Sequence, residues 1–146
     1  MQNDKVLELW NDMWRDGNWV PSIADSLNGL TAEEAEWAPA STSHCIWQEV
    51  AHIIFWRQVT LNNLAGIPGP SEAEVNANEF AIPDERTAVN WTAEVAKLLD
   101  TQEKLARAIE FGAGDLSRVT YHLIHDAYHL GRITHLRQMM GVQPKF

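Results

Sequence analysis

The sequence lacks the features of several large protein classes. Its 146 residues include a single cysteine, Cys45, which cannot form a disulfide within the chain and fits a reducing compartment. No run of about 18 apolar residues occurs, so we expect no transmembrane helix. Residues 1–5 carry no basic segment leading into an apolar core, so no secretory signal is expected. These absences together predict a cytoplasmic protein with no membrane partner.

Basic residues are also scarce. The chain has 11 Lys and Arg against 20 Asp and Glu, a net charge of −9 with histidine counted as neutral. Binding to nucleic acid requires a basic surface that neutralises phosphates, so we expect no nucleic-acid partner. Strand signals are missing as well, because no alternating β-branched run lies between turn residues. What remains is an acidic, all-α protein.

Apolar residues recur at helical spacing in segments that glycine and proline separate. Thr31 and Glu34 have the spacing of a capping box, Ser43 and Thr87 are candidate N-caps, and Gly141 is a candidate helix end. The expected helices are residues 4–15, a short helix after Pro21, a short helix after Thr31, residues 43–65, residues 87–111, and residues 117–140 with Asp115 or Ser117 as the cap.

Residues 67–86 contain three prolines and scattered polar residues. We predict a long crossover loop there, with one helical turn near residues 72–76. Helices joined by short turns and one long crossover are typical of a four-helix bundle. We therefore expect an all-α four-helix bundle with a long crossover loop, folded as one domain over residues 1–146.

The most informative motif is His125-Asp126-Ala127-Tyr128-His129, within the last expected helix. Residues four apart on a helix lie one turn above the other, so both imidazoles can reach one metal ion. Imidazole is a ligand for zinc, nickel, copper and iron. A third histidine, His52, belongs to the helix expected over residues 43–65. Three histidines on one ion leave coordination positions open, as in a catalytic site.

The positions of these histidines on their helices agree with a shared site. At about 100° per residue, His125 and His129 fall on a flank beside the main apolar stripe, and His52 falls on a similar flank of its own helix. Both flanks are partly apolar and hold imidazole, where a surface helix would carry Glu and Lys. We expect the two flanks to face each other or to line a cleft.

Other interpretations stay open at this point. A histidine among apolar residues is most often a hydrogen-bonded core residue. His122 lies three residues before His125, so this pair also has chelating spacing. His44 lies eight residues before His52, roughly 12 Å along a helix axis, too far to share its metal unless the chain folds back. His135 projects to the opposite side of its helix. Asp126 projects about 100° from His125, which makes it a weak candidate to orient that ring.

The chain resembles the DinB/YfiT-like superfamily of metal-dependent four-helix-bundle proteins. The pieces that carry the resemblance are residues 43–57, SHCIWQEVAHIIFWR, and residues 123–133, LIHDAYHLGRI, with Leu136-Arg137 after them; residues 27–37 are similar to the turn before the first piece. The resemblance covers nearly the whole chain. It implies that His52, His125 and His129 bind a divalent metal, commonly zinc or nickel, with iron as a further candidate, and that His122 does not. Many relatives have Gln where Arg132 stands.

The resemblance implies a reaction type as well. Similar proteins transfer low-molecular-weight thiols to electrophiles or catalyse thiol-dependent isomerisation, and many have no known reaction. Our first hypothesis is a metal enzyme of the transferase or hydrolase type that acts on a small molecule, with a low-molecular-weight thiol as a candidate substrate. A metal lowers the pKa of bound water or thiol. Peptide hydrolysis of the H-E-x-x-H type is not expected, because Asp126 stands in place of the glutamate.

Two residues are weak catalytic candidates. Glu49, one turn before His52, is a candidate base or orienting group, with a solvated or capping role as the alternative. Cys45 lies two turns from His52 on the same flank, although small buried packing is the commoner role of a lone cysteine. Trp56 and Tyr128 are candidates for the wall of a substrate cleft, and packing in the core or at an interface is the alternative for both.

Two hypotheses of other classes remain. One is a bundle that binds a metal or small ligand without turnover. The other is a homodimeric structural or stress-response protein whose interface includes Trp10, Trp14 and Trp19.

Overall fold

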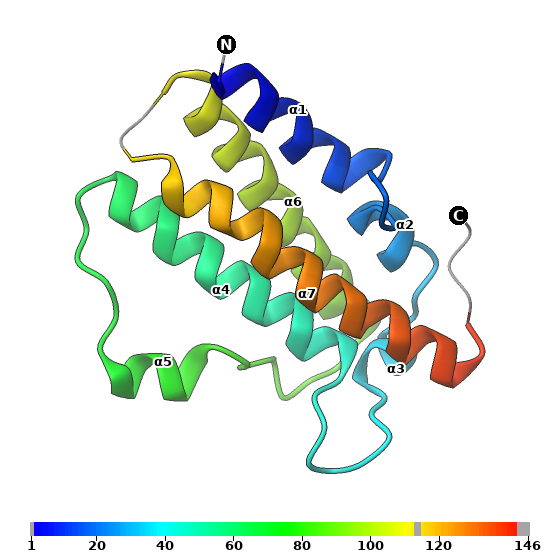
Figure 1. Ribbon diagram of the computed structural model, residues 1–146. Coiled ribbons are helices and arrows are strands. Elements are labelled where there is room, and N and C mark those ends of the chain that lie inside the picture. The colour runs from blue at the N-terminus through cyan, green and yellow to red at the C-terminus, as the bar shows by residue number, and fades with distance from the viewer. Residues whose placement is uncertain (1, 113–114, 143–146) are drawn as a thin grey trace.

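The computed structural model describes residues 2–112 and 115–142, which form seven α-helices and no strand (Figure 1). The prediction of an all-α protein is confirmed. The helices are α1 (Gln2–Arg15), α2 (Ile23–Leu27), α3 (Ala32–Glu36), α4 (Ile46–Leu64), α5 (Glu72–Asn78), α6 (Ala88–Glu110) and α7 (Ser117–Met140). In these residues, no helix is both long and apolar enough to cross a membrane.

The four long helices pack against one another. Helix α4 contacts both α6 and α7, and α1 contacts the same two helices. Figure 1 shows these helices running side by side, with the short α2 and α3 near one end. Helix α5 belongs to the crossover between α4 and α6 and lies on the outer side of α4. The crossover therefore runs along the outer side of α4, so crossover residues can contact side chains of that helix.

Several helix ends form as the sequence indicates. Thr31 accepts a hydrogen bond from the backbone of Glu34, whose carboxylate accepts one in return, so the capping box is present. Thr87 caps α6. Gly141 ends α7 in a left-handed conformation with φ of 73°, which glycine adopts without steric cost.

Two predicted caps are wrong. Helix α4 begins after Cys45, not at Ser43, because the Gln48 side chain accepts a hydrogen bond from the Cys45 backbone and closes the first turn there. The N-cap of α7 is Leu116; Asp115 stabilises this end from one residue earlier by accepting a hydrogen bond from the Ser117 backbone.

The core is apolar and holds three tryptophans. Trp10 is fully buried and donates a hydrogen bond to the Gln102 carbonyl, and Trp91 donates one to the Leu30 carbonyl. The rings of Trp47 and Trp91 contact each other with centroids 5.3 Å apart. Trp10 therefore belongs to the core and not to an exposed dimer face.

A buried ion pair joins the long helices at one point. Arg57 of α4 donates a hydrogen bond from Nε to Asp126 of α7 at 2.8 Å, with Nη2 at the same distance, and both side chains are fully buried. The guanidinium also donates to Thr101 of α6 and lies 4.5 Å from the Trp10 ring of α1. This pair fixes the register of α7 beside His125.

Candidate metal centre

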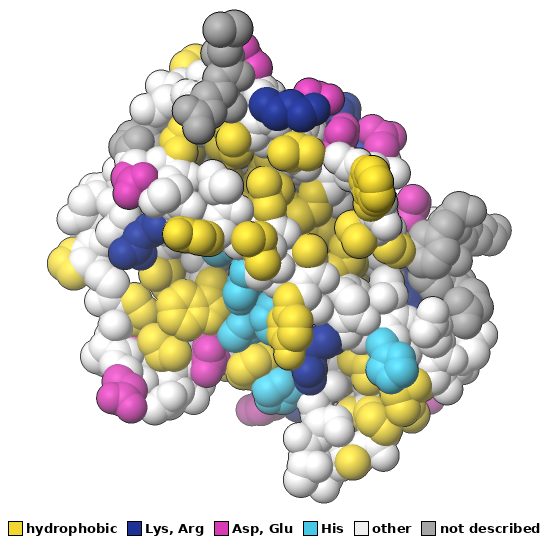
Figure 2. All heavy atoms as spheres, in the orientation of Figure 1, with side chains coloured by type: hydrophobic (Ala, Val, Ile, Leu, Met, Phe, Trp, Pro, Cys, Tyr) yellow, Lys and Arg dark blue, Asp and Glu magenta, His cyan; other side chains and the backbone are white. Residues whose placement is uncertain are grey.

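The three histidines singled out in the sequence come together between α4 and α7. Their ligand-capable nitrogens lie within 4.8 Å of one another. The Nε2 atoms of His52 and His125 are 3.2 Å apart, and the ring of His129 lies 4.4 Å from His52 and 4.5 Å from His125 between centroids. Figure 2 shows histidine side chains gathered on this face among hydrophobic ones.

The outer nitrogen of each ring faces a carboxylate. His129 Nδ1 donates to Glu49 Oε2 at 2.5 Å, and His125 Nδ1 donates to Asp126 Oδ1 at 3.0 Å. His52 Nδ1 lies 3.5 Å from Glu79 Oε2, too long for an ordinary hydrogen bond. A proton held on Nδ1 leaves Nε2 as a bare acceptor, which is the form that binds a metal.

The spacing of the two Nε2 atoms fits a metal. A tetrahedral zinc ion with bonds of about 2.0–2.1 Å places its nitrogen ligands about 3.3 Å apart. The 3.2 Å between His52 and His125 agrees with that separation. The donor set and its spacing therefore fit a divalent ion bound by imidazole.

The neutral form of His52 depends on the proton position in His125. With both protons on Nδ1, the two Nε2 lone pairs meet at 3.2 Å; with the His52 proton on Nε2, that nitrogen donates to His125 and the Nδ1 lone pair faces the Glu79 carboxylate. Burial and then the neighbouring His129 and His125 lower the pKa of His52 to about 4, so the doubly protonated form is disfavoured near neutrality.

Glu49 is fully buried and orients His129 from across the helix interface. Burial alone raises the pKa of this carboxyl, but the hydrogen bonds from His129 and from Arg132 Nε, at 2.7 Å, outweigh it and hold the pKa below its usual value. The carboxylate is therefore charged at neutral pH. Glu49 has the environment of an orienting group, and a solvated role for it is excluded.

Asp126 accepts a hydrogen bond from His125, although helix projection made it only a weak candidate to orient that ring. Projection locates the Cβ atom, whereas this carboxylate extends into the core and presents Oδ1 to His125 and Oδ2 to Arg57. Burial opposes ionisation of Asp126, but the Arg57 guanidinium, and then the neighbouring His122 and the hydrogen bond from His125, hold its pKa well below the usual range.

The crossover contributes two residues that the sequence did not reveal. Glu79 faces His52, and the Phe80 ring stacks on His52 with centroids 4.2 Å apart. On its other side Phe80 stacks on His44 at 3.7 Å. His44 thus supports the aromatic cover of the site. No periodicity or spacing marks residues 79 and 80 in the sequence, so only the fold identifies them.

His122 is buried but has a different environment. Its Nε2 lies 2.8 Å from Thr60 Oγ1, and its Nδ1 lies 3.7 Å from Asp126 Oδ1 without a hydrogen-bond partner in the described residues. The nitrogens of His122 and His125 and an oxygen of Asp126 form a second group compact enough for a metal. His135 is exposed, as its projection predicts.

Cys45 has the environment of a packing residue. Its side chain is 4% exposed within the apolar core, and burial raises the pKa of the thiol. A protonated, buried thiol is a poor nucleophile. These properties count against the catalytic role considered for Cys45.

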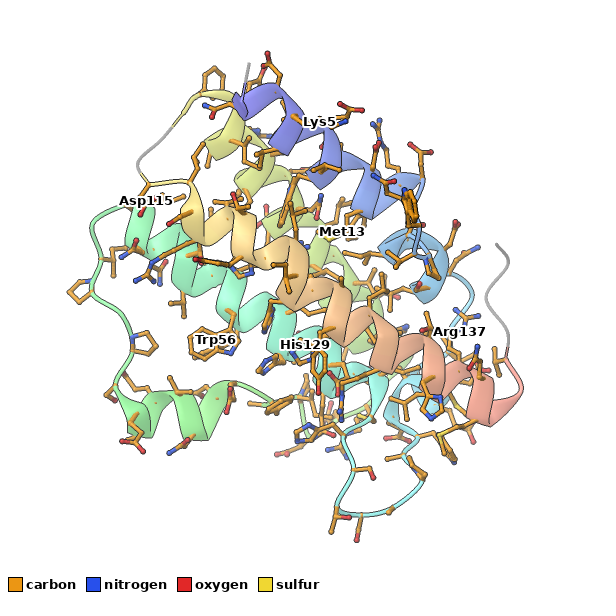
Figure 3. All side chains as sticks on the ribbon, in the orientation of Figure 1. Lys5, Met13, Trp56, Asp115, His129 and Arg137 are labelled. Atoms are coloured by element: carbon orange, nitrogen blue, oxygen red, sulfur yellow. The ribbon has the colours of Figure 1, made fainter. Side chains whose placement is uncertain are left out.

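A cavity of about 400 Å³ opens beside the histidines. His125 and His122 line it together with Trp56, and the side chain of His125 is 31% exposed, against 9% for His52 and 8% for His129. Figure 3 shows Trp56 on the side of α4 that faces the crossover. Tyr128 does not line this cavity and is 63% exposed.

Comparison with known protein families identifies the family of this chain. The family model of the DinB superfamily matches residues 22–139. This stretch is most of the chain and contains all three histidines, so the chain belongs to the DinB superfamily. No curated protein and no solved structure matches the chain.

Proposed function

We propose that this member of the DinB superfamily is a metal-dependent enzyme in which Nε2 of His52, His125 and His129 hold one divalent ion. We interpret its four long helices as a four-helix bundle of one domain, with the crossover covering the ion. Imidazole suits zinc, nickel and iron; the family resemblance favours zinc or nickel, with iron as a further candidate. The proposed substrate is a small molecule.

The arrangement around the Nδ1 atoms carries this proposal. Metal-bound histidines in proteins commonly donate their second ring nitrogen to a carboxylate, which fixes the tautomer and the ring orientation. Glu49 and Asp126 accept such hydrogen bonds from His129 and His125. A purely packing role does not require a histidine to direct an unprotonated Nε2 toward two other imidazoles.

The supporting residues keep the three rings in place. Asp126 is held by Arg57, and Glu49 is held by Arg132, so each orienting carboxylate has a cation on its second oxygen. These two carboxylates and two guanidinium groups are neutral overall, and the Glu79 carboxylate beside His52 adds one negative charge. A dipositive ion among three neutral imidazoles would therefore keep a net positive charge.

The source of the attacking group is inferred from the state of Cys45. The one thiol of the chain, Cys45, is buried and protonated. A small molecule must therefore bring the attacking group: a low-molecular-weight thiol in a transferase or a water in a hydrolase. A bound divalent ion supplies Lewis acidity that lowers the pKa of either. Thiol transfer is the type that family resemblance favours.

A ligand set of His122, His125 and Asp126 is the competing site. Both oxygens of Asp126 already have partners, and Arg57 neutralises its charge. Binding a cation there places it next to a buried guanidinium, which opposes binding. We therefore favour the three-histidine set.

Elemental analysis of the untagged protein, purified without nickel chromatography, tests the proposal. We expect about one zinc, nickel or iron per chain in the wild type, and loss of that metal in His52→Ala and in His129→Ala with helical content retained. His135→Ala is the matched control, because His135 is an exposed histidine on the same helix as His129.

The outcomes separate the alternatives. Metal retained in His129→Ala overturns the three-histidine site. Metal lost in His135→Ala as well indicates adventitious surface binding. No metal in any variant, even after addition of each ion, leaves the histidines with packing and hydrogen-bonding roles.

A further inference from the structure

The cavity beside His125 has two chemically different parts. Its apolar wall consists of Trp56, Val59 and Tyr121. Its polar side consists of the hydrogen-bonded pair Thr60 and His122, and of Arg118. A cavity of about 400 Å³ with a mainly apolar lining and a few polar groups is typical of a site for a small organic ligand.

Arg118 is the one permanently charged group in this lining. Its side chain is exposed and makes no hydrogen bond or close ion pair in the residues that the structure describes, although it interacts electrostatically with Asp115. The carboxylate closest in sequence, Asp115, accepts a hydrogen bond from the Ser117 backbone at the start of α7, where Figure 3 labels it. The cation therefore remains available to a ligand.

The sign of this charge is informative because the chain is acidic overall. A net charge of −9 repels anions from most of the surface, whereas the cavity wall offers them a guanidinium. None of the residues that line the cavity is Asp or Glu. A carboxylate in this cavity therefore finds one positive partner and no negative lining residue.

The cavity connects this cation to the proposed metal centre. His125 lines one part of it and Arg118 another, and the two are seven residues apart on α7, about 10 Å along the helix axis. His125 is also the most exposed of the three histidines, so access to the centre is on its side. A ligand with an apolar middle spans the distance between them.

We propose that this cavity holds the body of the substrate and that the substrate is a small carboxylate with an apolar or aromatic body, whose anionic end is bound by Arg118. The apolar body lies against Trp56 and Tyr121, and the other end lies near His125. This inference rests on the proposed function, because it takes the reacting end to lie at the three histidines.

Calorimetric titration with phenylbutyrate and its uncharged analogue phenylbutyramide tests the inference on the metal-loaded and the metal-free protein. We expect the wild type to bind the carboxylate more tightly than the amide. Arg118→Gln is expected to weaken carboxylate binding about tenfold or more, the usual effect of losing one hydrogen bond to a charged group, and to leave amide binding unchanged.

Two further variants make the result specific. Arg107→Gln, which removes an exposed arginine of α6 that does not line the cavity, is expected to change neither affinity. Trp56→Leu is expected to weaken both ligands alike, because it removes apolar wall and no charge. Metal content is measured in every variant and is expected to be the same in Arg118→Gln as in the wild type.

The failures are distinguishable. Equal affinity for the carboxylate and the amide, no saturable binding of either, or no effect of Arg118→Gln overturns the inference while the metal analysis stands. Absence of metal together with selective, Arg118-dependent carboxylate binding overturns the proposed function and retains a carboxylate site.

Discussion

Two polar clusters lie between α4 and α7, and they differ in how completely their groups are satisfied. The arginine cluster is Arg57, Asp126, Thr101 and the Trp10 ring; its cation and anion are fully buried and directly paired. The histidine cluster is His52, His125 and His129; there the Nε2 atoms of His52 and His125 lie 3.2 Å apart. The arginine cluster pairs a cation with an anion, whereas the histidine cluster brings together three side chains that can each bind a metal through nitrogen.

The two clusters share one residue, and this connection explains their proximity. Asp126 binds Arg57 through Oδ2 and His125 through Oδ1. The arginine cluster thus holds the carboxylate that orients a histidine of the other cluster. A buried ion pair thus holds in place a carboxylate that orients a candidate metal ligand, which is the arrangement that preorganises a binding site.

The largest effect is expected from breaking the arginine cluster. Arg57→Met leaves the Asp126 carboxylate buried without its cation, so we expect a loss of about 3–5 kcal/mol in the free energy of unfolding, measured with urea. Arg118→Met, at an exposed arginine, is the control and is expected to cost less than about 0.5 kcal/mol. An equal free energy of unfolding in the two variants would show that the buried Arg57–Asp126 pair does not stabilise the fold.

Removing an orienting carboxylate is expected to have the next largest effect. Glu49→Gln keeps the shape but loses the charge that holds the His129 proton, so we expect zinc affinity to fall about 10–100-fold in competition titrations with a chelator. Arg132→Gln is the comparison. The Arg132 side chain is 45% exposed and touches Glu49 but not the histidines, so a smaller loss is expected. If both variants lose the same affinity, the role of Glu49 lies in its pairing with Arg132.

The three histidines of the cluster can largely be predicted from the sequence, whereas the crossover residues that contact them cannot. A spacing of four on one helix is a local property, so His125 and His129 are visible in sequence, and the partly apolar flank of the second helix points to His52. Glu79 and Phe80 have no such signal. They contact His52 because the crossover folds back over α4. The path of the crossover depends on contacts along its whole length, so no local sequence pattern predicts it.

The arginine cluster does have a signal in the helical periodicity of the sequence. Arg57 lies seven residues after Val50, in the apolar stripe of α4, and Asp126 lies seven residues after Val119, in the stripe of α7. Opposite charges in two apolar stripes are costly unless they pair. Their pairing also explains how Asp126 is accommodated in the core, from which its second oxygen reaches His125.

The smallest effect on metal binding is expected from His122, which belongs to neither cluster. His122→Ala removes the hydrogen bond between Nε2 and Thr60 and leaves the three ligands and their carboxylates in place. We expect a stability loss of about 1 kcal/mol or more in urea unfolding, and a change in zinc affinity of less than about threefold. A loss of zinc affinity as large as that of His129→Ala would assign the ion to His122, His125 and Asp126. In that case Asp126 would bind the metal directly, and its ion pair with Arg57 would be weakened.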